Sequence, residues 1–167
     1  MHYYTVHYRF SQRFPFPARK AYDWSTDYRG DDLPLLGQQG TREVERIDDA
    51  TLILTDTRTD SGKPETKVRL VRLFPDILTW TNTRLSDVGK HSQFIYQIVP
   101  DGVTASRLEF TGAQVEGAGT KPSKPELAAA TEKYAKADAL IWVNLAAAMK
   151  KDLAPRRSPG TSRNRAR

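Results

Sequence analysis

The chain has 167 residues, of which 38% are hydrophobic and 28% charged, a length and composition that fit one folded domain with a real core. Cysteine is absent, which excludes disulfides, thiolate zinc sites and cysteine nucleophiles. The formal net charge of +6 suggests an anionic partner, but its distribution along the chain, described below, argues against a dedicated nucleic-acid domain.

Residues 1–14 alternate between apolar and polar side chains. Tyr4, Val6, Tyr8 and Phe10 fall on one side, which predicts a strand with one buried face. The charged side chains between them interrupt any signal-peptide run, and no later stretch is long enough to span a bilayer. We therefore expect a cytoplasmic protein without integral membrane association.

Two short helices are expected after this strand. Pro15 and Pro17 end the alternation, so that residues 18–26 form a first helix, with Trp24 near the core. Residues 31–36 form a second helical turn, with Asp31 or Asp32 as its N-cap and Gly37 as its stop.

Six further extended segments follow, over 41–47, 51–59, 65–74, 77–85, 92–99 and 105–115. The short connections between them contain Asp-Asp, Asp-Ser-Gly, Pro-Asp, Val-Gly and Asp-Gly, which favour tight turns. Consecutive strands should therefore pair antiparallel as a meander, with the large apolar side chains of the later strands on one face.

Residues 123–153 have helical periodicity. Ser123 and Glu126 form a capping box, and Pro155 follows the end. The expected apolar stripe is Leu127, Ala130, Tyr134, Ala137, Ile141, Leu145 and Ala148. We thus expect a domain over 1–154 and a basic disordered tail over 155–167.

The tail explains the net charge. It holds five arginines and no acid, and removing these five from the 26 basic residues leaves 21 against 20 acidic ones. The body is therefore close to neutral. The tail indicates at most weak contact with anions and no specific binding of nucleic acid.

This order of elements resembles the helix-grip superfamily, the SRPBCC or START-like proteins that include polyketide cyclases and birch-pollen-allergen relatives. The local likeness lies in the segment Phe-Pro-Ala-Arg-Lys-Ala-Tyr-Asp-Trp at 16–24, and in segments 92–96 and 106–110. The resemblance implies an α+β fold in which a curved antiparallel sheet of about seven strands wraps around the long C-terminal helix. It also implies a cavity, used in the superfamily for lipids, sterols, quinones, polyketides or hormones, and in some branches for client proteins.

The residues themselves also favour a cavity, because large aromatic side chains on the sheet face small ones on the helix. Trp80, Phe94, Tyr96 and Phe110 lie on the apolar face, opposite alanines of the helix. The alternative is a solid core in which the alanines only allow close approach of the helix.

Polar side chains follow the apolar ones along two strands. Arg58, Asn82 and Arg84 would orient a carboxylate, hydroxyl or carbonyl of a ligand if they lie inside, and Asp56 would pair with either arginine. The alternative is that these strand ends are solvated. On the helix, Asp138 is either a desolvated acid with a raised pKa or an exposed flank residue.

The predicted ligand-binding residues are Trp24, Arg58, Trp80, Asn82, Arg84, Phe94, Tyr96, Phe110, Tyr134, Asp138 and Trp142. The histidines have no metal-ligand spacing, so the sequence predicts neither a metal site nor a cofactor. The first hypothesis is a binding or carrier protein for an apolar small molecule such as a lipid, quinone or polyketide. The alternatives are a cyclase or dehydratase that uses Tyr96, Asp138 or Arg84, and a client-binding module.

Overall fold

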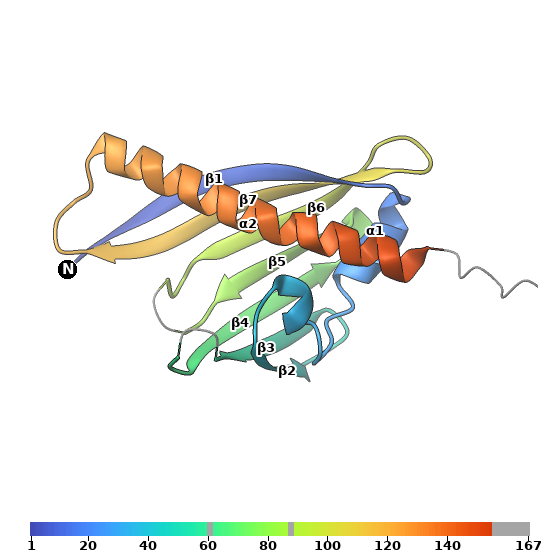
Figure 1. Cartoon of the computed structure of the whole chain (residues 1–167), viewed down its shortest axis with the longest axis horizontal. Helices are drawn as coiled ribbons and strands as arrows, with labels where there is room; N and C mark the ends of the chain where they lie inside the picture. The colour runs from blue at the N-terminus through green and yellow to red at the C-terminus, as the bar shows by residue number, and fades with distance from the viewer. Residues whose placement is uncertain (60–61, 87–88, 155–167) are drawn as a thin grey trace, which may run out of the picture.

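Seven strands form one antiparallel sheet that curves around a long C-terminal helix (Figure 1). The computed structural model describes residues 1–59, 62–86 and 89–154. The elements are β1 (His2–Phe14), α1 (Ala18–Ser25), η1 (Leu33–Leu36), β2 (Gly40–Arg46), β3 (Thr51–Arg58), β4 (Glu65–Phe74), η2 (Pro75–Ile77), β5 (Thr79–Arg84), β6 (Gln93–Pro100), β7 (Ser106–Ala118) and α2 (Lys124–Leu153). This is the α+β architecture that the sequence predicted.

The strand order is β1-β7-β6-β5-β4-β3-β2, so every neighbour from β2 to β7 is a hairpin partner, and β1 closes the far edge against β7. In that last pair Tyr8 lies opposite Gly112. A Cβ atom on Gly112 would lie 2.7 Å from the Tyr8 ring. The glycine therefore lets this tyrosine lie flat across β7, which brings its hydroxyl under the helix.

The capping box that the sequence predicted begins α2. Ser123 Oγ accepts a hydrogen bond from the Glu126 backbone N–H at 3.4 Å, and the Glu126 carboxylate accepts one from the Ser123 N–H at 2.7 Å. The packed face differs in part from the expected stripe, because Trp142 and Met149 are buried whereas Ala137 is exposed. Within the described part of the chain, no helix has both the length and the apolar character needed to cross a membrane.

Two local expectations were wrong. The fourth predicted segment begins as a strand at Thr79 and not at residue 77, because Pro75–Ile77 forms a 3-10 turn and Leu78 has a left-handed backbone with φ of 50°. The second predicted helical turn is present as a 3-10 turn that ends at the left-handed Gly37, as expected, but Asp32 at its N-cap position makes no side-chain cap. The Asp32 carboxylate instead accepts a hydrogen bond from the Arg29 backbone N–H at 2.8 Å. The predicted tail lies outside the described residues.

Candidate functional site

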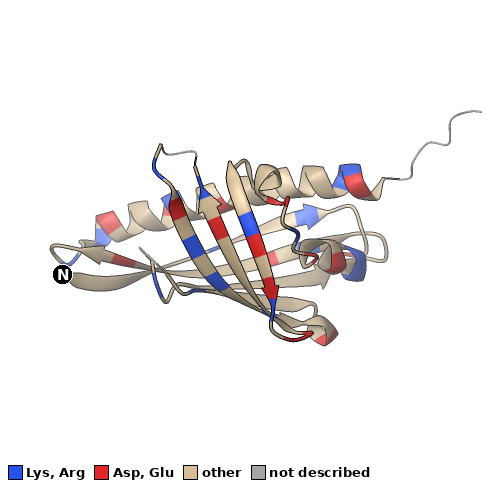
Figure 2. Ribbon diagram, turned by 90° about the horizontal axis from the view of Figure 1, so that it is seen from below, with Lys and Arg blue, Asp and Glu red and all other residues tan. Residues whose placement is uncertain are grey.

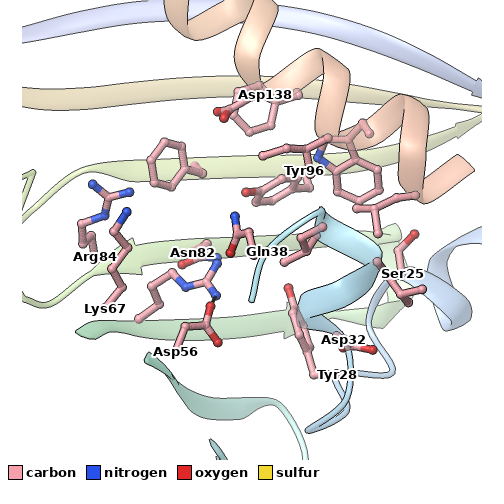
Figure 3. Close-up of a pocket in the computed structure, with 18 of the residues that line it drawn as sticks. Ser25, Tyr28, Asp32, Gln38, Asp56, Lys67, Asn82, Arg84, Tyr96 and Asp138 are labelled. Carbon is pink, nitrogen blue, oxygen red and sulfur yellow. Dashed lines mark hydrogen bonds and ion pairs between the residues drawn. The ribbon is translucent and has the colours of Figure 1, made fainter. Parts of the chain in front are cut away.

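A cavity of about 580 Å³ lies between the concave face of the sheet and α2 (Figure 3). Every residue of the predicted ligand-binding set lines it: Trp24, Arg58, Trp80, Asn82, Arg84, Phe94, Tyr96, Phe110, Tyr134, Asp138 and Trp142. The fold thus brings together residues from α1, four strands and α2. Their contact with a ligand stays a prediction.

One half of the wall is aromatic. Trp80 and Tyr96 are cross-strand partners whose rings stack with centroids 4.9 Å apart and planes 4° apart. Trp142 of α2 lies 6.0 Å from Trp80, and the Phe110 ring lies 5.0 Å from Tyr96. Because these rings also belong to the hydrophobic core, the same residues stabilise the fold and line the cavity.

The other half is charged. Figure 2 shows Lys, Arg, Asp and Glu gathered on β2, β3 and β4. Asp56 was expected to pair with Arg58 or Arg84, but its carboxylate accepts hydrogen bonds from Arg42 Nε at 2.7 Å and Arg42 Nη2 at 3.0 Å, and a further one from Arg69 Nη2. The register explains this correction, since Arg42 lies directly opposite Asp56.

The pKa of Asp56 reflects these partners. Burial alone would raise the pKa of its carboxyl group. The hydrogen bonds and positive charges of Arg42 and Arg69 outweigh burial and hold the pKa below its ordinary value. Asp56 is therefore ionised at neutral pH. Its carboxylate offsets the positive charges of Arg69 and of Arg42, and Arg42 also pairs with Asp32 at 3.4 Å.

Asp138 lies inside the cavity and not on an exposed flank of α2. Its Oδ2 accepts a hydrogen bond from the Tyr8 hydroxyl at 2.6 Å. Burial raises the pKa of Asp138, while the Tyr8 hydrogen bond and the charge of Arg84 act in the opposite direction. Burial and the Asp138 charge together raise the pKa of Tyr8. The pair is thus a desolvated carboxyl group with a neutral hydroxyl donor.

Replacing Tyr8 with phenylalanine should raise the pKa of Asp138 further. The substitution removes the hydrogen bond that favours the charged carboxylate and leaves the ring in place. Carbon NMR titration of the Asp138 carboxyl group in both proteins measures the shift. A lower or unchanged pKa in the variant would show that this hydrogen bond does not act on the carboxylate.

Several residues of the cavity wall are not in the set that was predicted from the sequence. The Tyr134 hydroxyl donates to Glu116 Oε1, which also accepts a hydrogen bond from Gln114 Nε2 at 3.0 Å. Burial and Glu116 together raise the pKa of Tyr134. The alternation of β7 continues from Phe110 through Gln114 to Glu116, so extending the period to the strand end would have found both residues.

The segment after α1 forms another side of the cavity. Tyr28 lines it, and burial raises the pKa of this tyrosine to about 12 although nearby arginine charges lower it. The segment contacts the end of α2 through Arg29, whose Nη2 lies 3.9 Å from Asp152 Oδ2. In α1 itself, Trp24 Nε1 donates a hydrogen bond to Asp152 Oδ2 at 3.1 Å. Trp24 is therefore both a wall residue and an attachment point.

Asn82 is the most deeply placed polar residue of the predicted set, with 3% of its surface exposed. Among the described residues, its Oδ1 atom has no hydrogen-bond partner. A buried acceptor of this kind is costly unless another molecule supplies a donor. Over residues 1–59, 62–86 and 89–154, no three histidine, aspartate or glutamate side chains are grouped so that they could hold a metal ion.

Several solved protein structures have the same arrangement of strands and helices as this chain. The ZhuI aromatase/cyclase from a Streptomyces species has a TM-score of 0.68 at 13% identity, over 89% of this chain and 93% of that chain. The chain has the helix-grip fold of the SRPBCC, or START-like, proteins. Norcoclaurine synthase from Thalictrum flavum, solved with dopamine and hydroxybenzaldehyde, has a TM-score of 0.66 at 16% identity over 93% and 90% of the two chains.

The allergen Ara h 8.0201 has the same helix-grip fold, with a TM-score of 0.64 at 12% identity over 89% of this chain and 99% of that chain. No family model matches the sequence, and no curated protein matches it. At these identities the likeness shows the fold alone, and it confirms the predicted helix-grip architecture. It leaves the ligand to be argued from the cavity itself.

Proposed function

We propose that this protein binds a small amphipathic molecule with a flat ring system in the cavity between sheet and α2. The observation that carries the proposal is the division of the wall into an aromatic half and a charged half around about 580 Å³. Ligand sites in proteins are commonly concave, mostly apolar and supplied with a few convergent polar groups. The cavity is concave, and its aromatic half supplies the apolar surface while its charged half supplies convergent polar groups.

The half-buried Tyr96, which stacks on the buried Trp80, favours a planar ligand. Aromatic faces attract other rings in offset or edge-on arrangements, and such pairs contribute about 0.5–1.5 kcal/mol beyond the burial of apolar area. Asn82 and Arg84 follow on the same face of β5, so that polar substituents of the ligand would meet them. The predicted ligand-binding residues thus form a site for the rings of the ligand, with polar side chains at one end.

The direct test is native mass spectrometry of the purified protein, followed by solvent extraction and identification of what co-purifies. A stoichiometric ring compound is the expected result. A protein without any bound compound, together with failure to bind a panel of aromatic probes in titrations, would contradict the proposal.

Replacing Ala137 with tryptophan should abolish binding by filling the cavity. Ala137 lines the cavity from α2, and its exposed side chain carries no part of the core. The matched control is Ala147 to tryptophan, at an exposed position of the same helix that should leave binding unchanged. Titration of a fluorescent aromatic probe measures both, and equal binding by the two variants would place the ligand elsewhere.

A second candidate is a proton-transfer enzyme of the cyclase or dehydratase kind, favoured by the Tyr8–Asp138 pair. A desolvated carboxyl group beside a hydroxyl donor has the chemistry of an acid–base catalyst. The test uses the extracted compound as substrate, and Asp138 to asparagine should abolish its conversion while binding remains. Binding without conversion by the unaltered protein would reject this candidate. The client-binding alternative stays a prediction.

A further inference from the structure

The cavity wall places three cationic side chains close together on β4 and β5. Arg69 lies directly opposite Arg84 in the register, and Lys67 lies two residues before Arg69 on the same face. Directly opposed side chains have Cβ atoms about 4.5–5.5 Å apart, and diagonal neighbours lie about 7–8 Å apart. Figure 3 shows Lys67 and Arg84 at the same end of the cavity, in agreement with this register. Neither Lys67 nor Arg69 was in the predicted set.

Two described acids near Lys67, Asp56 and Glu65, are respectively held by arginines and partly exposed to water. Asp56 lies opposite Lys67 in the register, but both of its oxygens accept hydrogen bonds from arginines. Lys67 Nζ contacts Glu65 Oε1 at 3.2 Å, and the Glu65 side chain is 43% exposed, so water screens that pair. Like charges facing one another across a strand pair are destabilising, and more so on a partly buried wall.

The fold gives Arg84 a specific place. A Cβ atom on Gly89, which has φ of 84°, would lie 2.6 Å from Arg84 Nη1, so the glycine provides the room that this guanidinium occupies. The positive charge of Arg84 lowers the pKa of Asp138 and opposes the rise in pKa of Tyr96. Its field therefore reaches the aromatic half of the cavity.

We propose that the ligand is an aromatic acid, whose oxyanion group lies against Lys67 and Arg84 while its rings lie against the half-buried Tyr96. This inference rests on the proposed function and narrows its ligand class. An oxyanion that lies against the two cations forms charge-assisted hydrogen bonds with both. The Asn82 amide, next along β5, accepts a donor group from the same ligand.

The test compares two fluorescent probes that share one ring skeleton. Anilinonaphthalene sulfonate carries an oxyanion, and phenylnaphthylamine is its neutral counterpart. Replacing Lys67 with methionine should weaken binding of the sulfonate about tenfold and leave binding of the neutral probe unchanged. Arg84 to methionine should act in the same direction. The control is Arg72 to methionine, which removes the same charge from the exposed face of β4 and should change neither affinity.

The salt dependence of probe binding to the unaltered protein is a second test, which does not depend on whether the variants fold. Affinity for the sulfonate should fall as salt is added, while affinity for the neutral probe stays constant. Equal affinities of the two probes in all variants, with no salt dependence, would overturn the oxyanion site and leave the ring site standing. Failure of both probes to bind would overturn the proposed function and this inference with it.

Discussion

Replacing Trp80 with alanine should lower the free energy of unfolding by about 3–5 kcal/mol. Trp80 is 1% exposed, and its indole touches Tyr22 of α1, Tyr96 of β6 and Trp142 of α2. The substitution leaves a void at the point where three elements meet. Since domains of this size are stable by about 5–15 kcal/mol, a large part of the total would be lost.

Urea unfolding followed by circular dichroism measures this loss without relying on tryptophan fluorescence. Ile95 to alanine is the matched control, because Ile95 lies on the neighbouring strand β6 with 48% of its surface exposed. This control substitution should lower the free energy of unfolding by less than about 1 kcal/mol, since large losses of stability come from cavities in the core. Similar losses in the two variants would show that the aromatic wall is not what holds the sheet to α1 and α2.

The strands could be predicted from sequence because each hairpin has its own local signal. Turn residues separate segments of period two, and most observed strand bounds agree with the predicted ones within a few residues. The start of β5 differs by two residues, because the Pro-Asp-Ile sequence forms a 3-10 turn that is followed by a left-handed leucine. The Pro-Asp pair predicts a turn here, but nothing in the sequence indicates that the turn extends to Leu78, since leucine rarely adopts that backbone.

The face of α2 could be predicted only in part. Tyr134, Ala137, Ile141 and Leu145 from the expected stripe line the cavity, whereas Trp142 and Met149 next to it are the residues that are buried. An alanine-rich helix has apolar residues on more than one face, so spacing alone does not say which face packs and which lines a void. Asp138 was included in the predicted site because it lies between aromatic residues of the helix. Its partner Tyr8 could not be predicted, because the two residues are far apart in the sequence.

The ion pairs in the charged half of the cavity could not be predicted from the sequence. Arg42, Asp56 and Arg69 come from three strands, and which arginine meets the carboxylate depends on the register of two hairpins. A shift of two residues would keep every face assignment and exchange every partner. Alternation therefore predicted that Asp56 lies inward, while only the three-dimensional register shows what it binds.

Replacing Asp56 with asparagine should cost about 3–5 kcal/mol of stability at neutral pH, the second large effect expected here. Asp56 is 3% exposed and bridges Arg42 and Arg69, so the variant leaves two cations in the wall without their shared carboxylate. Urea unfolding measures the loss. Asp76 to asparagine, at an exposed position in η2, is the control and should be nearly neutral.

The pH dependence of this loss tests its electrostatic origin. The folded-state pKa of Asp56 lies below its ordinary value, so its contribution is complete above the unfolded pKa of about 3.9 and disappears as pH falls through the folded pKa. The difference in stability between the original protein and the asparagine variant should therefore shrink in acid. Asp138 acts in the opposite direction in both proteins, because its raised pKa favours the folded state as pH falls, and it cancels in the difference. A difference that stays constant from neutral to acid pH would mean that asparagine disturbs packing at this position and that the carboxylate charge does not hold the two arginines.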